Sequence, residues 1–250
     1  MEAEQRKARR RYDSKYIVHD GRRFVYFVIQ KAACTSVKSA LLPLFDLDAK
    51  RKRFPERFEA TRKDGSRVVL VHKLFDRSRH QIDKGEMLAG LDAEYRDHFK
   101  FAFVRNPWDR LVSCYLQKIV SDPLIDGRKQ MNLNPPGTDR FYAGMPFVEF
   151  VEAVHATDDE HANPHFRSQY ATVCDPEGRV MADFVGRFEN LREDFAGVSE
   201  RIGVPSLELP HRLKSPGRES RPYTDFYDGR LRDLVGERYR EDVELFGYAY

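Results

Sequence analysis

The chain has 250 residues, and its 41% of hydrophobic and 12% of aromatic residues are enough to fill a core, which excludes a largely disordered chain. Lysine and arginine total 43 against 40 aspartates and glutamates, and the formal net charge of +3 leaves an anionic ligand easy to accommodate. The longest apolar run spans only Phe24 to Ile29, where a membrane helix needs about 20 residues, and 3 cysteines are too few for a disulfide framework or a four-cysteine zinc site.

The N-terminal segment is basic and is not followed by an apolar stretch. Its cluster RKARRR at positions 6–11 is typical either of a solvated tail or of an arm for an anionic partner. A secretory signal is not indicated, and we expect a cytoplasmic, bacterial protein with no transmembrane segment and at most peripheral contact with a membrane. Because no repeat or low-complexity linker divides the chain, we expect residues 1–20 to form a flexible tail and residues 21–250 a single domain.

The first predicted element is a strand. FVYFVI at 24–29 is a continuous apolar run of the kind found in strands buried on both faces of a parallel sheet. The small-residue turn KAACTS follows at 31–36, and VKSALLPLF at 37–45 predicts a helix that Pro43 ends or bends. A strand, a short turn and a helix in this order are half of a βαβ unit.

The rest of the chain continues the alternation of strands and helices. The predicted elements are, in chain order, a loop or exposed hairpin over 46–66, a buried strand over 67–71, a helix over 86–98, a strand over 99–104, a helix from Pro107 through 120, a loop over 121–145, a short helix over 145–156, a loop over 157–181, a strand over 183–188, a helix over 191–203, a basic loop over 204–224 and a helical end over 223–246. This order predicts an α/β protein with three layers, a P-loop-like fold whose central, mainly parallel sheet is flanked by helices.

The first strand-to-helix junction carries groups that suit a phosphate. Lys31 supplies a point charge, and the small Ala33 and Cys34 let the backbone close around an anion near the positive end of the helix. Thr35 and Ser36 add hydroxyl donors. An ordinary capped helix start fits the same residues, and the chain has no G-x-x-x-x-G-K-[ST] string, so a nucleotide triphosphatase is poorly supported.

The second junction repeats this arrangement with different chemistry. Arg105 ends a predicted strand and has the planar guanidinium that binds phosphate in a bidentate way, and Ser113 follows about two helical turns later. A surface arginine and a small helical serine are the alternative. Two phosphate-competent junctions in one sheet suggest a ligand with two separated phosphate-like ends, because ligands bind beyond the carboxyl ends of parallel strands.

Two segments resemble the nucleotide-binding segments of the carbohydrate sulfotransferases. VIQKAACTSVKSALL is similar to their 5′-phosphosulfate loop, and FAFVRNPWDRLVSCYLQKI to their 3′-phosphate segment. FVGRFENLREDF resembles the segment that ends a later strand of the family, and HFRSQY at 165–170 resembles a stretch of the branch that sulfates chondroitin, dermatan and related glycans. Every fixed position of the pattern Arg-[Asp/Asn]-Pro-x-x-Arg-x-x-Ser-x-Tyr is filled, by Arg105, Asn106, Pro107, Arg110, Ser113 and Tyr115. The loop departs from many members in having Ala33 and Cys34 where they carry Gly-Thr, and the Golgi relatives have a membrane anchor.

The resemblance implies a donor, 3′-phosphoadenylyl sulfate (PAPS), whose sulfuryl group moves in line to a hydroxyl of a carbohydrate or another small acceptor and leaves 3′-phosphoadenosine 5′-phosphate (PAP). Lys31 and the loop with Ala33, Cys34, Thr35 and Ser36 would hold the phosphosulfate, and Arg105 and Ser113 the 3′-phosphate. Arg187 would contact the donor or a carbonyl near it, or else form a plain salt bridge. Lys214 would cover the nucleotide or lie on a solvated face. No metal is implied.

The acceptor hydroxyl needs a base, and His72 is the sequence candidate because it ends the strand predicted over 67–71. A structural histidine is the alternative. His165 and Gln169 are candidates for the acceptor groove, or else ordinary loop residues. Two other functions remain open: a module that binds anions or RNA through its basic segments, and a P-loop-like kinase. The leading interpretation is an enzyme with no nucleic-acid partner.

Overall fold

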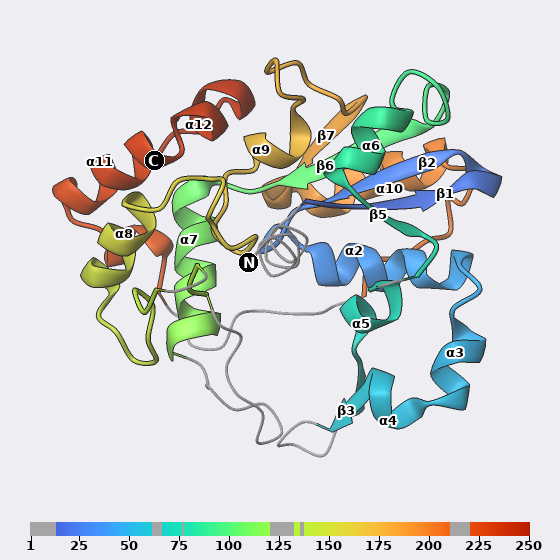
Figure 1. Cartoon of the computed structure of the whole chain (residues 1–250), viewed down its shortest axis with the longest axis horizontal. Helices are drawn as coiled ribbons and strands as arrows, with labels where there is room; N and C mark the ends of the chain where they lie inside the picture. The colour runs from blue at the N-terminus through green and yellow to red at the C-terminus, as the bar shows by residue number, and fades with distance from the viewer. Residues whose placement is uncertain (1–13, 62–66, 77, 121–132, 136–137, 211–220) are drawn as a thin grey trace.

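The computed structural model contains a central five-stranded sheet in the spatial order β5-β1-β2-β6-β7 (Figure 1). The structure describes residues 14–61, 67–76, 78–120, 133–135, 138–210 and 221–250. The strands of the sheet are β1 (Lys15–His19), β2 (Phe24–Val28), β5 (Gln81–Asp83), β6 (Phe99–Val104) and β7 (Phe184–Arg187). The pairs β2–β6 and β6–β7 are parallel, whereas β1 runs antiparallel to both β2 and β5. The sheet is therefore mixed, with the predicted parallel strands at its centre.

Strand β1 corrects the predicted domain boundary. Residues 15–19 lie in the segment that the sequence assigned to a flexible tail, yet Tyr16 and Ile17 are fully buried and the strand pairs with the whole length of β2. Tyr16 also donates its hydroxyl to the Thr172 carbonyl, at 2.9 Å. The run KYIVH is short and follows many charged residues, so the apolar pattern that reveals longer strands is weak here. Of the predicted tail, residues 1–13 lie outside the described residues.

Helices cover both faces of the sheet, as the three-layer prediction requires. Along β2 the side chains of Phe24 and Tyr26 pack on one face with α2 (Cys34–Leu41), α5 (Val71–Phe75) and α10 (Leu191–Arg201). Val25 and Phe27 point to the other face, toward α6 (Lys84–Gly90) and the C-terminal α12 (Arg240–Phe246). This alternation follows from the two-residue period of a strand, and it explains why β2 is apolar throughout.

A second group of helices gathers at one end of the sheet (Figure 1). Here α7 (Pro107–Tyr115), α8 (Phe147–His155) and α11 (Gly229–Arg238) share a cluster around Trp108 and Phe150. The other elements are η1 (Asp20–Arg22), η2 (Leu42–Leu44), α3 (Asp48–Arg53), α4 (Pro55–Phe58), β3 (Glu59–Thr61), β4 (Arg67–Val69), η3 (Leu116–Val120), α9 (Tyr170–Val173), η4 (Phe188–Asn190) and η5 (Tyr223–Phe226). None of the helices in the described ranges is long and apolar enough to cross a bilayer.

Several predicted elements differ from the observed ones. The loops predicted over 46–66 and 157–181 contain short elements, namely α3, α4 and β3 in the first and α9 in the second, and the predicted helical end is divided into α11 and α12. The strand predicted over 67–71 is shorter and pairs antiparallel with β3 in a separate two-stranded sheet, because an apolar run does not specify its pairing partner. His72 therefore lies in α5 and not at a strand end. The helix predicted over 86–98 ends at Gly90, whose carbonyl accepts turn hydrogen bonds from Ala93 (3.1 Å) and Tyr95 (2.8 Å).

Candidate functional site

The two predicted phosphate junctions meet at one edge of the sheet. Since β2 and β6 run parallel, their carboxyl ends lie side by side, and the residues that follow them contact each other. The Arg105 guanidinium donates through Nη1 to the Lys31 carbonyl, at 3.0 Å. The two junctions therefore lie together at one edge of the sheet, where a single ligand with two separated phosphate-like ends can reach both.

The first junction has the backbone geometry of an anion-binding turn. Lys31 and Ala33 adopt left-handed conformations with φ of 67° and 60°, which cost a non-glycine residue roughly 1–3 kcal/mol. Ala33 is the N-cap of α2 and offers no side-chain acceptor to the first-turn N–H groups. These groups and the positive end of the helix dipole therefore point toward the turn, as in sites that bind phosphate.

The Lys31 ammonium is held by a side chain that the sequence analysis did not single out. Its Nζ donates to Gln117 Oε1 at 2.7 Å, and Gln117 lies in η3, a short π-helical turn that continues α7. The pKa of Lys31 is lowered to about 8, mainly by burial; Cys114 acts in the opposite direction, and the neighbouring Arg105 and Lys118 contribute to the lowering. A π turn shifts the register of a helix, so no sequence period predicts that residues 117 and 118 face this site.

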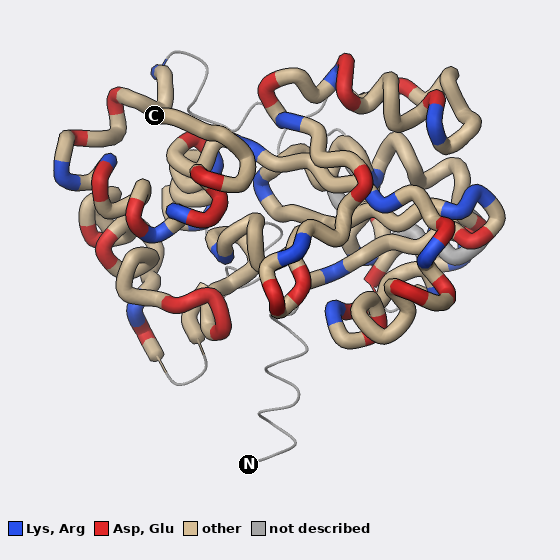
Figure 2. Tube along the Cα trace, turned by 90° about the horizontal axis from the view of Figure 1, so that it is seen from above, with Lys and Arg blue, Asp and Glu red and all other residues tan. Residues whose placement is uncertain are grey.

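Cations outnumber carboxylates around the junctions. Lys31, Lys38, Lys118, Arg105 and Arg110 converge here. Asp109 accepts from Arg105 Nε at 2.7 Å and so neutralises one of them. Elsewhere on the described trace, basic and acidic positions are interspersed (Figure 2). A local excess of buried positive charge is expensive without a counter-ion, and it favours an anionic ligand.

Arg105 acts more as a scaffold than as an open phosphate ligand. It is 4% exposed, its Nε and Nη1 are engaged, and its guanidinium stacks 4.0 Å from the centre of the Phe188 ring. Among the described residues, its Nη2 has no hydrogen-bond partner. A contact of Arg105 with a 3′-phosphate through both terminal nitrogens, as its planar guanidinium suggested, would require the bond to Lys31 to break.

A second buried guanidinium joins the turn before Lys31 to a distant loop. Arg110, on α7, is 2% exposed and donates through Nε to the Gln30 carbonyl (2.9 Å) and through Nη2 to the Pro164 carbonyl (3.3 Å). His165 follows Pro164 in the chain, so the loop from 163 to 169 lies against the first junction. The sequence motif contained Arg110 but gave no reason to connect it with this loop.

His72 is clamped between two side chains of α2. Its Nδ1 lies 3.2 Å from Lys38 Nζ and its Nε2 lies 2.9 Å from Thr35 Oγ1. A lysine ammonium can only donate, so Nδ1 accepts, Nε2 carries the hydrogen, and the hydrogen bond runs from His72 to Thr35. Burial, together with Lys38 and Lys118, lowers the pKa of His72 to about 3. His72 is thus a neutral imidazole without an available lone pair, which does not fit the predicted role of base.

Comparison with known proteins identifies the family. A sequence model described as "Sulfotransferase family" matches residues 14–249. The chain belongs to the sulfotransferase family. It is 27% identical to carbohydrate sulfotransferase 14 of Danio rerio over 93% of its own length and 61% of that protein. It is 25% identical to carbohydrate sulfotransferase 11 of Mus musculus (95% and 68%) and to carbohydrate sulfotransferase 9 of Homo sapiens (94% and 53%). No solved structure matches the chain.

The structure places the other sequence candidates of this sulfotransferase as follows. Ser36 and Ser113 are buried, and the Cys34 thiol donates to Gln30 Oε1 at 3.1 Å. Arg187 lies at the end of β7, where it donates to the Phe246 carbonyl and stacks 4.8 Å from the Tyr248 ring. The contact with a carbonyl is one of the predicted alternatives, and a contact with the donor stays a prediction. Lys214 lies outside the described residues.

Gln169 does not face a groove. It is fully buried, its Oε1 accepts from Arg105 N (2.8 Å), and its Nε2 donates to the Arg105 carbonyl (2.9 Å) and to Asp242 (3.2 Å). The predicted contact of Gln169 with an acceptor is therefore wrong, because its amide fixes the loop to the end of β6. Its neighbour His165 is half-buried beside the cations, and this loop histidine stays a candidate.

The clamp on His72 predicts the effect of removing its cation. In Lys38→Met, the pKa of His72 rises above its value of about 3, since the repulsion by Lys38 is gone, but stays below 6.5 because the burial remains. In the control Lys73→Met, which removes an exposed lysine next to His72 in the chain, the pKa is unchanged. Histidine ring resonances followed by NMR from pH 8 downward measure both values, and equal behaviour of the two variants would contradict the clamp.

Proposed function

We propose that the protein is a sulfotransferase that moves the sulfuryl group of PAPS to a hydroxyl of a carbohydrate or another small hydroxylated acceptor. The observation that carries this proposal is the direct contact between Arg105 and Lys31, which joins two anion-competent strand ends into one site. Membership of the sulfotransferase family supports the reaction class. The names of the relatives, all carbohydrate sulfotransferases, support the acceptor class.

The donor fits the chemistry of the two junctions. The N-terminus of α2 and the Lys31 ammonium suit the 5′-phosphosulfate, and α7 with Ser113 and the free Nη2 of Arg105 suits the 3′-phosphate. In the transfer, the acceptor oxygen forms a bond to sulfur while the bond from sulfur to the 5′-phosphate oxygen breaks, and PAP leaves. Negative charge grows on the leaving phosphate, where Lys31 is placed to stabilise it.

The polarised chain from Lys38 through His72 to Thr35 supports donor binding in this proposal. Because His72 donates to Thr35 Oγ1, the Thr35 hydroxyl hydrogen is directed away from His72 and is available to an anion at the first turn of α2. Thr35 then contributes a hydrogen bond to the phosphosulfate, and Lys38 transmits part of its charge through the imidazole.

Two other functions have less support. A kinase would need the triphosphate-binding string that the chain lacks. An RNA-binding module would use a basic face, but the charges on the described trace are interspersed (Figure 2). The cytoplasmic location stays a prediction.

Calorimetric titration with PAP and with ATP separates these functions. The proposed function predicts binding of PAP in the micromolar range and no binding of ATP. Tight binding of ATP without binding of PAP would support a kinase. Affinity for both that falls steeply with salt would support a general anion-binding module and contradict the proposal.

The lowered pKa of Lys31 gives PAP binding a pH dependence. Below pH 8 the Lys31 ammonium is charged, and its contribution to PAP affinity does not change with pH. Above pH 8 Lys31 loses its proton, and the affinity for PAP falls. A charged hydrogen bond contributes about 1.5–3 kcal/mol, so the loss is roughly tenfold or more. In Lys31→Arg the guanidinium stays charged, and the decrease near pH 8 disappears. A decrease of the same size in both proteins, measured by calorimetry from pH 6.5 to 9.5, would exclude Lys31 as its cause.

A further inference from the structure

We propose that His165, and not His72, is the general base that takes the proton of the acceptor hydroxyl. This inference rests on the proposed function, because it assigns a residue to the reaction of that site. It is carried by the hydrogen bonds of His165, by its position beside Lys31, and by the charges that surround it.

The hydrogen bonds of His165 fix its tautomer. Asn163 Oδ1 accepts the backbone N–H of His165 at 3.1 Å, which identifies this side-chain atom as the amide oxygen. The same oxygen lies 2.8 Å from His165 Nδ1, so the ring must donate through Nδ1. The hydrogen of the neutral imidazole is therefore on Nδ1, and Nε2 has a lone pair. Among the described residues, Nε2 has no hydrogen-bond partner, which is the opposite of the situation of His72.

The position of His165 follows from the two hydrogen bonds that Arg110 donates. One guanidinium holds the carbonyls of Gln30 and Pro164, and the next residues in the chain are Lys31 and His165. These bonds bring the backbone at His165 close to the backbone at Lys31, and the imidazole lies near enough to the Lys31 ammonium for the charge of Lys31 to act on it. An in-line transfer needs its base on the acceptor side of the sulfur, opposite the leaving oxygen, and a separate loop facing the phosphate turn can supply a base there.

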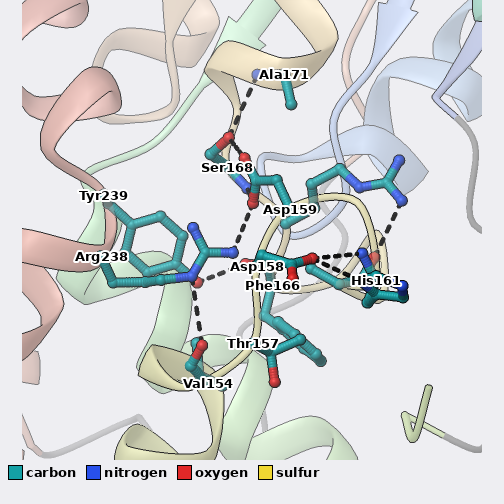
Figure 3. Close-up of polar contacts among 12 residues, drawn as sticks. Val154, Thr157, Asp158, Asp159, His161, Phe166, Ser168, Ala171, Arg238 and Tyr239 are labelled. Carbon is teal, nitrogen blue, oxygen red and sulfur yellow. Dashed lines mark hydrogen bonds and ion pairs between the residues drawn. The ribbon is translucent and has the colours of Figure 1, made fainter.

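The loop that carries His165 is held at several points. Arg238 donates to Asp159 Oδ1 at 2.5 Å, and the same carboxylate accepts the N–H of Ser168 (3.0 Å) as well as its hydroxyl (Figure 3). Tyr239 donates its hydroxyl to the Phe166 carbonyl at 2.5 Å. With Gln169 fixed on β6, these bonds hold the backbone on the C-terminal side of the imidazole, as a positioned base requires.

Burial and the nearby charges make His165 neutral in the free protein, and a bound donor makes it a stronger base. Burial lowers the pKa of His165 well below 6.5, and Lys118, Lys31, His72 and Arg110, which face it, contribute in the same direction. No carboxylate is among these groups. A bound phosphosulfate brings negative charge to the same cations, which raises the pKa of His165 toward the working pH. The base is therefore most effective when a donor is present to react.

The proposed step balances as follows. The acceptor hydroxyl gives its proton to His165 Nε2 while its oxygen forms the bond to sulfur. The bond between sulfur and the 5′-phosphate oxygen breaks, and its electron pair leaves with PAP. The imidazolium of His165 then releases the proton to solvent, which returns the imidazole to its starting tautomer.

Histidine side-chain NMR tests the assignment without an acceptor. We expect the Nδ1–H tautomer for His165 and the Nε2–H tautomer for His72, with the resonances assigned by their loss in His165→Ala and His72→Ala. On saturation with PAP, the pKa of His165 rises and its shift exceeds that of His72. An Nε2–H tautomer at His165, or a pKa of His165 that PAP does not raise, would overturn the proposal. If the wild-type protein does not bind PAP in calorimetry, the proposed function itself fails, which is a separate result.

Kinetics of the variants give the second test, with PAPS as donor and desulfated chondroitin as the probe acceptor. In His165→Ala, we expect the single-turnover rate of transfer to fall by a factor of about 10²–10⁴, while the affinity for PAP stays within about threefold of the wild type. Added imidazole should raise the rate of this variant by a factor of about ten or more. The matched control His161→Ala removes an exposed histidine of the same loop, bonded to Asp158, and keeps the wild-type rate. Wild-type transfer by His165→Ala, or a loss that comes with lost PAP binding and no rescue, would overturn the role of base. The NMR experiment needs no acceptor, so it tests the assignment of His165 whichever acceptor is used in the kinetics.

Discussion

Two buried guanidinium groups hold the backbone of the site together, and the rest of the arrangement depends on them. Arg105 binds the Lys31 carbonyl, and Arg110 binds the carbonyls of Gln30 and Pro164. Carbonyl oxygens that bond to a charged donor are fixed strongly, because leaving a buried guanidinium without partners costs more than an ordinary lost hydrogen bond. The phosphate turn, the start of α7 and the loop with His165 are therefore fixed relative to one another before any ligand binds.

This scaffold divides the work among the cations. The arginines are committed to backbone carbonyls and to Asp109, whereas Lys31 reaches the turn where an anion would lie. The two histidines are divided in the same way. Both ring nitrogens of His72 are engaged, by Lys38 and Thr35. His165 keeps a lone pair on Nε2 because its Nδ1–H donates to Asn163 Oδ1. The two histidines have the same intrinsic pKa, so their different roles follow from their hydrogen-bond partners.

The sequence predicted the centre of the fold and both junctions, and it failed where the decisive information is not local. Strands β2 and β6 are long apolar runs followed by turn residues, so their pattern is strong. Strand β1 was missed because its short apolar segment follows a charged stretch, and the run at 67–71 was placed in the wrong sheet because an apolar pattern carries no pairing information. Lys38 was detectable in principle, since it follows Cys34 by one helical turn on a buried face.

The site chemistry shows the same limit. The sequence found Lys31 and Arg105 from their place after strands, but the burial of Gln169 and the clamp on His72 depend on residues more than thirty positions away. The π turn that brings Gln117 to Lys31 has no sequence period. Motifs therefore identified the edge of the sheet where the ligand is expected, whereas the roles of single side chains depend on contacts between distant parts of the chain.

A crystal structure of the protein with PAP tests the central claim most directly. The arrangement predicts that the 5′-phosphate lies against Lys31 and the first turn of α2, that the 3′-phosphate lies beside Ser113 on α7, and that the carbonyl contacts of Arg105 and Arg110 are unchanged. A nucleotide that leaves either junction empty, or that binds only after Arg110 has released the Gln30 and Pro164 carbonyls, would contradict it.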